Sequence, residues 1–162
     1  MSNIGLHKAM EQAGCKVLVT PVGDRYVLEA MAKGGYSLGG EQSGHIIFLD
    51  YNTTGDGILT ALELIAALKN SGKKLSHLGS LMTRYPQLLV NVRLQSKDGW
   101  DTNPAIAAAI AAGEQELGDN GRILVRPSGT EPLIRVMAEG PSEADLQRIV
   151  SHIAAVIKAE LP

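Results

Sequence analysis

Residues 122–139 read RILVRPSGTEPLIRVMAE, in which two apolar stretches flank a short polar loop. The stretches 122–126 and 133–139 are rich in Val, Ile and Leu, the residue types that favour strands. The connecting residues 127–132 include Pro, Ser and Gly, which are typical of turns. This part of the chain therefore predicts two adjacent strands joined by one loop.

Two helices and a further strand surround this pair in the second half of the chain. Residues 88–95 alternate as a strand does, and an Ala-rich helix is predicted over residues 104–117, with Asn103 as its N-cap and Pro104 at its first position. Ser142 is the predicted cap of a last helix. The apolar face of that helix is formed by Leu146, Ile149, Val150, Ile153 and Ile157. The order β-α-β-β-α predicts an α+β layer with its helices on one face of the sheet.

The first half alternates helices and strands in another way. Helices are predicted over residues 5–13, 25–33 and 58–70, and short apolar strands over residues 16–20 and 45–49. The segment KVLVT at 16–20 is apolar almost throughout, as in a strand that is covered on both faces. Helix 58–70 has a broad apolar face, made by Leu59, Leu62, Ile65, Ala66 and Leu68. The alternation predicts an α/β fold.

A change of pattern near residues 71–87 places a domain boundary there. We expect a partial α/β domain over residues 1–74, a linker helix within 75–86 and an α+β domain over 87–162. Because the first domain begins with a helix and no strand precedes it, we expect the chain to be part of a longer protein.

The composition excludes several classes of protein. The 162 residues include 15 Lys and Arg and 17 Asp and Glu, so a chain-wide basic surface that would bind nucleic acid is not expected. No apolar run approaches the roughly 18 residues of a membrane span, and the N-terminus does not resemble a signal peptide. The single Cys15 rules out an internal disulfide and a cysteine-built metal site. We expect a cytoplasmic protein without nucleic-acid or membrane partners.

The loop between the two predicted strands of the second half suits a phosphate group. It offers the hydroxyls of Ser128 and Thr130, the backbone at Gly129, and the guanidinium groups of Arg126 and Arg135. Converging N–H donors and planar arginine forks are what a phosphate dianion requires. An ordinary hairpin turn uses the same Pro, Ser and Gly residues. The residues alone leave these two interpretations about equal.

A second polar segment, GGEQSGH at 39–45, precedes the predicted strand 45–49. Glu41 and Ser43 alternate along it and are expected to point to one side, next to His45. Carboxylate and hydroxyl groups on a glycine-rich loop suit sugar hydroxyls, which both donate and accept hydrogen bonds. A plain loop with Glu41 in solvent is the alternative, and taken alone this segment favours it.

The segment TPVGDR at 20–25 connects a predicted strand to a helix, where ligands of α/β folds often bind. Asp24 is either a site residue or the cap of the helix. Arg25 at a helix N-terminus is unfavourable with respect to the helix dipole, which indicates another role for it.

The acidic loop 50–57 lacks the glutamate that a calcium loop needs at its last position, so Asp56 is expected only to cap the next helix.

Together the segments 22–25, 40–45 and 126–132, with Arg135, resemble the α-D-phosphohexomutase superfamily. Gln42 and the following HIIFLDYNTTGDG are most similar to its phosphoglucosamine branch. The resemblance covers essentially the whole chain. It implies the latter part of the superfamily's third, α/β domain and all of its fourth, α+β domain.

The resemblance also implies roles for individual residues. Glu41 and Ser43, with His45 beside them, would bind the sugar hydroxyls, and Asp24 and Arg25 would orient the substrate or move protons. The residues that would hold the phosphate that is not transferred are Arg126, Ser128, Gly129, Thr130 and Arg135.

The implied reaction interconverts glucosamine 6-phosphate and glucosamine 1-phosphate, a step towards amino-sugar nucleotides and cell-wall precursors. It uses an active-site phosphoserine and Mg²⁺ held by aspartates. The sequence lacks both a Ser-His-Asn-Pro loop and an Asp-x-Asp-x-Asp loop, so the chain is expected to bind no metal and to be inactive alone. Its expected partners are a phosphosugar and the missing N-terminal domains. The alternatives are a free-standing phosphosugar-binding module, a phosphomannomutase- or phosphoglucomutase-type fragment, and a structural domain that binds nothing.

Overall fold

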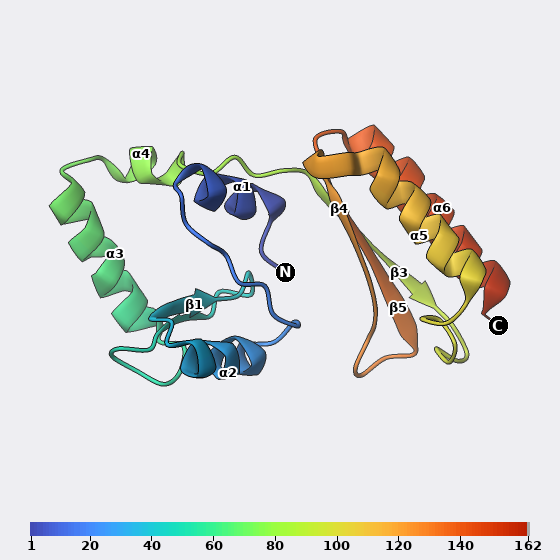
Figure 1. Ribbon diagram of the computed structural model, residues 1–162, viewed down its shortest axis with the longest axis horizontal. Coiled ribbons are helices and arrows are strands. Elements are labelled where there is room, and N and C mark those ends of the chain that lie inside the picture. The colour runs from blue at the N-terminus through green and yellow to red at the C-terminus, as the bar shows by residue number, and fades with distance from the viewer. Residues whose placement is uncertain (162) are drawn as a thin grey trace. The chain divides into compact units, whose positions relative to one another are not determined.

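The computed structural model describes residues 1–161, and Pro162, the last residue of the second predicted domain, lies outside them. The chain divides into two compact units, Met1–Thr83 and Arg84–Pro162, which we describe separately. Figure 1 shows the helices and strands of each. A mixed α/β fold class is confirmed, with six α-helices and two small sheets within the described part.

The second unit has the predicted β-α-β-β-α order. Its elements are β3 (Gln87–Arg93), α5 (Pro104–Leu117), a 3₁₀ turn (Gly118–Asn120), β4 (Arg122–Pro127), β5 (Leu133–Glu139) and α6 (Glu143–Glu160). The strands form one antiparallel sheet in the order β3-β5-β4, so the most apolar strand, β5, lies in the centre. The central position explains why almost every residue of β5 is buried.

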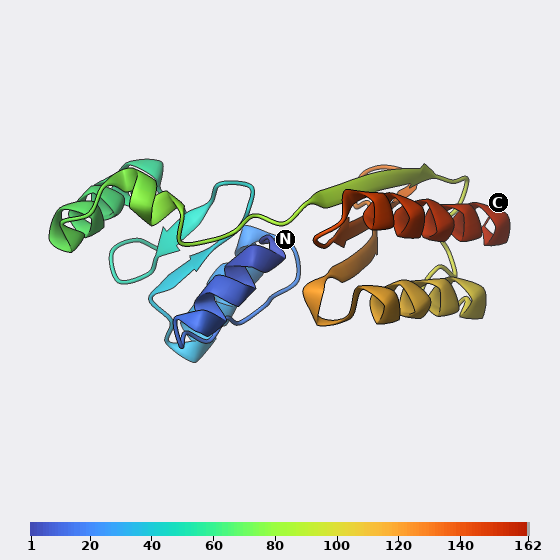
Figure 2. The same ribbon diagram turned by 90° about the horizontal axis from the view of Figure 1, so that it is seen from above.

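Helices α5 and α6 cover one face of this sheet, as Figure 2 shows. Alternate residues of β5 point to them, namely Ile134, Val136 and Ala138. The face of α6 that meets them is the one expected from the sequence: Leu146, Ile149, Val150, Ile153 and Ile157 are all buried. These aliphatic side chains are the hydrophobic core of the unit.

The predicted helix starts are confirmed by their capping hydrogen bonds. The Asn103 side chain accepts from the backbone N–H groups of Ala105 (2.9 Å) and Ile106 (3.2 Å), with Pro104 at the first helical position. The Ser142 hydroxyl accepts from the Asp145 N–H at 3.3 Å. Both contacts satisfy N–H groups that a helix leaves unpaired at its start.

The other face of the sheet carries a buried ion pair. Arg122 and Glu139 lie directly opposite each other on β4 and β5, and Arg122 Nε is 2.8 Å from Glu139 Oε2. The Glu139 side chain is completely buried. A buried carboxylate is tolerated only when charge and hydrogen bonds compensate it, so Arg122 stabilises the native position of Glu139.

The first unit is built around a two-stranded hairpin. Its elements are α1 (Ile4–Gln12), α2 (Asp24–Gly34), β1 (Leu38–Gly40), β2 (Ile46–Phe48), α3 (Gly57–Ser71) and α4 (Leu75–Gly79). Strands β1 and β2 pair antiparallel, and α2 packs against β1. A side chain at Gly39 would collide with Val27 and Met31 of α2, so the glycine permits this close contact.

One prediction for the first unit is wrong. Residues 16–20 form no strand, and Leu18 and Val19 are 52% and 63% exposed. The predicted helix 58–70 is present as α3, but its apolar face is not covered: Leu62 is 60% exposed and Ile65 58%. A strand needs a neighbouring strand for its backbone groups and an apolar face needs a cover, and residues 1–161 supply neither here.

The sequence also gave no sign of β1. Its residues are Leu38, Gly39 and Gly40, and glycine disfavours strands. Pairing with the apolar β2 overrides that local preference.

Candidate functional site

The register of β4 and β5 brings two arginines together at the loop that follows β4. Arg126 and Arg135 are direct cross-strand partners. Like charges opposite each other destabilise a sheet. Within residues 1–161 the Arg126 guanidinium forms no ion pair with a carboxylate. An arrangement that costs stability and leaves positive charge uncompensated is suited to binding an anion.

Arg135 keeps donors available for such an anion. Its Nε is buried and has no hydrogen-bond partner in the described part of the chain. Its Nη2 lies 3.7 Å from Glu131 Oε2, and Arg93 Nη2 lies 3.9 Å from Glu131 Oε1. These distances are too long for hydrogen bonds, so Glu131 attracts both guanidinium groups without saturating them.

The loop between β4 and β5 is shaped by Ser128. Its N–H donates to the Leu133 carbonyl at 2.9 Å, and its hydroxyl accepts from the Glu131 N–H at 3.3 Å. Ser128 is only 3% exposed, whereas Gly129 and Thr130 are exposed at the tip. The Ser128 hydroxyl therefore holds the loop in shape, and the tip between the arginines faces solvent.

The sequence did not point to Lys97, which also contacts this loop. Lys97 Nζ donates to the carbonyl oxygens of Ser128 (2.7 Å) and Glu131 (3.2 Å). The lysine follows β3, whose last residue, Arg93, pairs with Leu133 at the start of β5. Once that register is known, the segment after β3 must lie beside the loop before β5, as in Figure 1.

The second predicted segment forms the turn of the β1–β2 hairpin. The Glu41 N–H donates to the His45 carbonyl (2.8 Å), and the Gly44 N–H donates to the Glu41 carbonyl (3.0 Å). Gly44 has φ of +104°, a conformation that side chains disfavour, so glycine is required at this position. The turn places Glu41, Ser43 and His45 on one side, as predicted.

These three side chains form one chain of hydrogen bonds. The Ser43 hydroxyl donates to Glu41 Oε2 at 3.0 Å and lies 3.0 Å from His45 Nδ1. Because a hydroxyl has one proton and Glu41 takes it, the bond to His45 is donated by Nδ1–H. This leaves His45 Nε2 as an acceptor when the ring is neutral, and as a donor when it is charged.

Glu41 also joins this turn to the third predicted segment. Its Oε1 accepts from the Gly23 N–H at 3.1 Å, next to Asp24 and Arg25 at the start of α2. The structure therefore brings two of the three predicted segments together. Both segments lie within Met1–Thr83, so this contact is internal to the first unit.

We expect Glu41→Ala to free the loop before α2. The variant loses the acceptor of the Gly23 N–H, and one such bond contributes about 1 kcal/mol. Amide hydrogen exchange at Gly23 should then be roughly fivefold faster. Glu11→Ala, at an exposed position of α1, is the matched control and should leave this rate unchanged. Equal exchange in both variants would contradict the link between the two segments.

Asp24 and Arg25 occupy the first turn of α2. Asp24 is the first helical residue and not the cap, which is Gly23; its Oδ1 accepts from the Arg25 N–H at 2.9 Å. Arg25 Nε is 2.7 Å from Glu29 Oε1, and this bond raises the pKa of the exposed Arg25 guanidinium. Glu29 thus offsets the unfavourable position of Arg25 at the helix start.

The described residues offer neither a metal-binding cluster nor a membrane-spanning helix. Within residues 1–161 no three His, Cys, Asp or Glu side chains are grouped closely enough to hold a metal ion. No helix in that range is long and apolar enough to cross a membrane.

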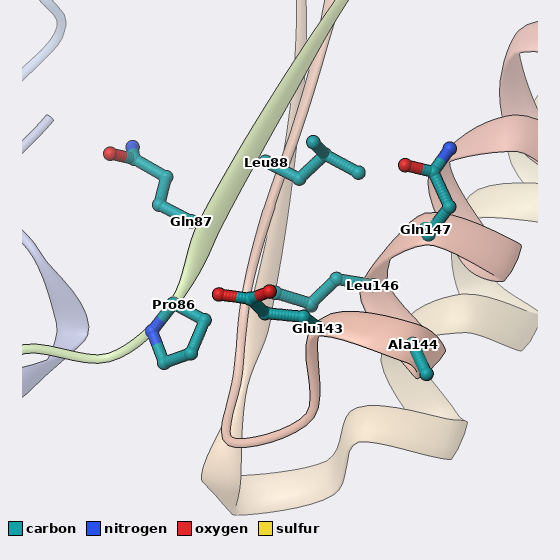
Figure 3. Close-up of a pocket in the computed structure, with 7 residues that line it drawn as sticks. All are labelled: Pro86, Gln87, Leu88, Glu143, Ala144, Leu146 and Gln147. Atoms are coloured by element: carbon teal, nitrogen blue, oxygen red, sulfur yellow. The ribbon is translucent and has the colours of Figure 1, made fainter.

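A hollow of about 430 Å³ in the second unit is not part of the arginine site. Figure 3 shows it between the start of β3 and the start of α6, lined by Pro86, Gln87, Leu88, Glu143, Ala144, Leu146 and Gln147. Gln87 pairs with Glu139 at the end of β5, whereas the arginine loop lies before the start of β5. The hollow and the loop are therefore at opposite ends of the sheet.

Family comparisons match both units. Residues 1–85 match the model for "Phosphoglucomutase/phosphomannomutase, alpha/beta/alpha domain III". Residues 89–156 match the model for the "Phosphoglucomutase/phosphomannomutase, C-terminal domain".

Curated relatives cover the whole chain at high identity. A phosphoglucosamine mutase of Brevibacillus brevis is 57% identical over 161 residues, which are 99% of this chain and 36% of that protein. A phosphoglucosamine mutase of Frankia alni is 57% identical over 162 residues, again 36% of its length. The chain thus spans little more than a third of the curated relatives that it matches.

Solved structures share the fold at low sequence identity. An Aspergillus fumigatus N-acetylphosphoglucosamine mutase superposes with a TM-score of 0.81 at 20% identity, over 98% of this chain and 37% of that one. A complex of the Aspergillus fumigatus enzyme with GlcNAc-6P and magnesium has a TM-score of 0.57 at 24% identity, over 68% of this chain and 22% of that one.

Proposed function

The chain belongs to the phosphoglucomutase/phosphomannomutase family, and from this we propose that it is the substrate-recognition part of a phosphoglucosamine mutase. The parent enzyme would interconvert glucosamine 6-phosphate and glucosamine 1-phosphate. The observation that carries the proposal is that Arg126, which forms no ion pair within residues 1–161, lies opposite Arg135 at a loop with an exposed Gly129–Thr130 tip. Arginine pairs on a loop are well suited to a phosphate monoester.

We propose that the loop of the second unit binds the phosphate that is not transferred. Arg126 and Arg135 would supply charge-assisted hydrogen bonds, and Gly129 and Thr130 would supply donors from the loop tip. Ser128 would contribute mainly by shaping the loop, since its hydroxyl already accepts from the Glu131 N–H.

The first unit would recognise the sugar. Glu41 and Ser43 are held side by side, and sugar hydroxyls can donate both to the carboxylate and to the remaining lone pair of the Ser43 oxygen. His45 Nε2 lies at the end of the same hydrogen-bond chain and would form a further hydrogen bond with the sugar. Asp24 and Arg25 would orient the substrate. The hydrogen bond from the Gly23 N–H to Glu41 supports this role, because it holds the start of α2 next to the turn that would bind the sugar.

The phosphoryl-carrying serine and the magnesium ligands of the parent enzyme would come from outside this chain. Residues 1–161 offer no cluster that fits a metal ion, and the chain covers 36% of its relatives' length. The other domains of the same protein would thus be its partners. Those other domains would cover the exposed apolar side chains of α3 and of residues 16–20.

The exposed Cys15, which forms no disulfide within residues 1–161, supports a cytoplasmic location.

A chimeric enzyme tests the proposal directly. The corresponding part of the Brevibacillus brevis phosphoglucosamine mutase is replaced by this chain, and mutase turnover is measured with Mg²⁺ and a bisphosphate activator. We expect turnover in the chimera and none with this chain alone. A folded but inactive chimera would refute the proposal, and phosphosugar binding by the chain alone would then favour a free-standing binding module.

Gly129→Ala should weaken phosphate binding without harming the fold. A methyl group at Gly129 meets no atom within 4 Å, and the residue does not have positive φ, so the chain itself does not require glycine there. Removing glycine from such a position leaves stability equal or higher by up to about 1 kcal/mol. We expect roughly fivefold weaker binding of inorganic phosphate in a titration, because the methyl group obstructs close backbone approach.

Gly57→Ala is the matched control for that variant. Gly57 also has open space around it and no positive φ, but it lies at the start of α3. It should leave the phosphate affinity unchanged. If Gly129→Ala binds phosphate as tightly as the unaltered chain, the loop tip is not in contact with the anion.

A further inference from the structure

We propose that Lys97 is a positioning residue, which aims the Gly129 N–H at the bound phosphate. The inference rests on the proposed phosphate site and adds to it a residue outside the loop. Lys97 is half-buried in the segment after β3, and its ammonium group donates to the carbonyl oxygens of Ser128 and Glu131 at 2.7 and 3.2 Å. It thus contacts the loop on both sides of the exposed tip.

The ammonium group of Lys97 is committed to these carbonyls. Lys97 forms no ion pair within residues 1–161. The neighbouring Asp98 is occupied locally, since its carboxylate accepts from the Ser96 hydroxyl at 2.8 Å and its N–H donates back to Ser96 at 3.1 Å. A charged donor makes stronger hydrogen bonds than a neutral one, so Lys97 is an effective anchor for the loop.

The geometry of the peptide bond links this anchor to the phosphate donor. The Ser128 carbonyl and the Gly129 N–H belong to the same peptide group, and the described chain contains no cis peptide bond. In a trans peptide the C=O and N–H bonds point in opposite directions. When Lys97 holds the Ser128 carbonyl, the Gly129 N–H must therefore point away from Lys97.

The contact with Glu131 has a different effect. The peptide group after Glu131 belongs to Pro132, which has no N–H, so this bond anchors the loop but orients no donor. Three contacts within the hairpin hold the rest of the loop: the Ser128 N–H donates to the Leu133 carbonyl, the Leu133 N–H to the Glu131 carbonyl, and the Glu131 N–H to the Ser128 hydroxyl. Lys97 complements them by setting the Ser128–Gly129 peptide plane.

The test compares three variants of the full 162-residue chain. Lys97→Met keeps an unbranched side chain that is one heavy atom shorter but removes the charge and the N–H donors, whereas Lys97→Arg keeps the charge and the donors. Lys158→Met, at an exposed position of α6 in the same unit, is the matched control for the lost charge. Inorganic phosphate is titrated, and the backbone amide shifts of Gly129 and Thr130 report binding.

We expect Lys97→Met to weaken phosphate binding about tenfold, Lys97→Arg to restore most of that loss, and Lys158→Met to leave the affinity unchanged. Salt would screen a purely electrostatic effect of Lys97 on the phosphate, but it would not remove the orientation of the Gly129 N–H. The difference in affinity between Lys97→Met and the unaltered chain should therefore persist at about 0.5 M NaCl. The residual dipolar coupling of the Gly129 N–H should change in phosphate-free Lys97→Met, and not in Lys158→Met.

The outcomes separate this inference from the proposed function. If the unaltered chain binds phosphate and Lys97→Met binds it with equal affinity, the role of Lys97 is overturned and the phosphate site stands. An unchanged Gly129 N–H coupling in Lys97→Met has the same meaning. Absence of any Gly129 or Thr130 shift in the unaltered chain overturns the phosphate site itself, and the role of Lys97 with it.

Discussion

Arg126→Ala is expected to weaken the binding of inorganic phosphate by roughly 10- to 150-fold while leaving the second unit at least as stable. A hydrogen bond to a charged group contributes about 1.5–3 kcal/mol, which is that range of affinity. The stability is expected to be equal or higher because Arg126 lies directly opposite Arg135 and forms no ion pair within residues 1–161. Removing one of two facing like charges relieves their repulsion.

Isothermal titration with phosphate and chemical denaturation measure the two effects on the same samples. Arg148→Ala is the control, since Arg148 lies on α6 and forms exposed ion pairs with Glu116 and Asp145. It should leave phosphate affinity unchanged and reduce stability only slightly. If Arg126→Ala destabilised the unit and left affinity intact, the arginine would be structural and the loop an ordinary hairpin turn.

Arg122→Met should destabilise the second unit by about 3–5 kcal/mol, because it removes the guanidinium that pairs with the buried Glu139 carboxylate. The fluorescence of Trp100, the single tryptophan of the chain, reports on this unit, because its side chain packs against the core under α5 and α6. Urea denaturation followed at Trp100 measures the change in the free energy of unfolding.

The double variant Arg122→Met with Glu139→Leu distinguishes charge burial from lost packing. Replacing both members of a buried ion pair by apolar side chains is often neutral, so the double variant should recover most of the stability. A double variant as unstable as Arg122→Met would show that the loss of stability comes from the packing of the Arg122 aliphatic stem and not from the lost ion pair.

The second unit was predictable because its local signals agree with one another. Asn103 with Pro104, and Ser142, mark helix starts by side-chain hydrogen bonds that reach only two or three residues along the chain. The spacing of Leu146, Ile149 and Ile153 identifies the buried face of α6 without knowledge of its neighbour. The arginines at either end of the hairpin loop were visible for the same reason, since loop and strands are contiguous in sequence.

The features that the sequence missed depend on distant partners. Lys97 is 31 residues from Ser128, and only the pairing of β3 with β5 brings them together. The wrong prediction at residues 16–20 has the opposite cause: the residues favour a strand, but a strand exists only with a neighbour. The link from Glu41 to Gly23 likewise spans 18 residues and leaves no local pattern.

The unpaired segment 16–20 has a consequence for the chain in solution. Within residues 1–161 no neighbouring strand pairs with its backbone N–H and C=O groups, and the side chains of Leu18 and Val19 are exposed. A short, β-prone segment with a free edge is a template onto which an identical segment of another molecule can add. Proline at position 21, which has no N–H to donate, limits how far such a ladder can extend. Residues 16–20 are thus the point from which we expect aggregation of the chain to begin.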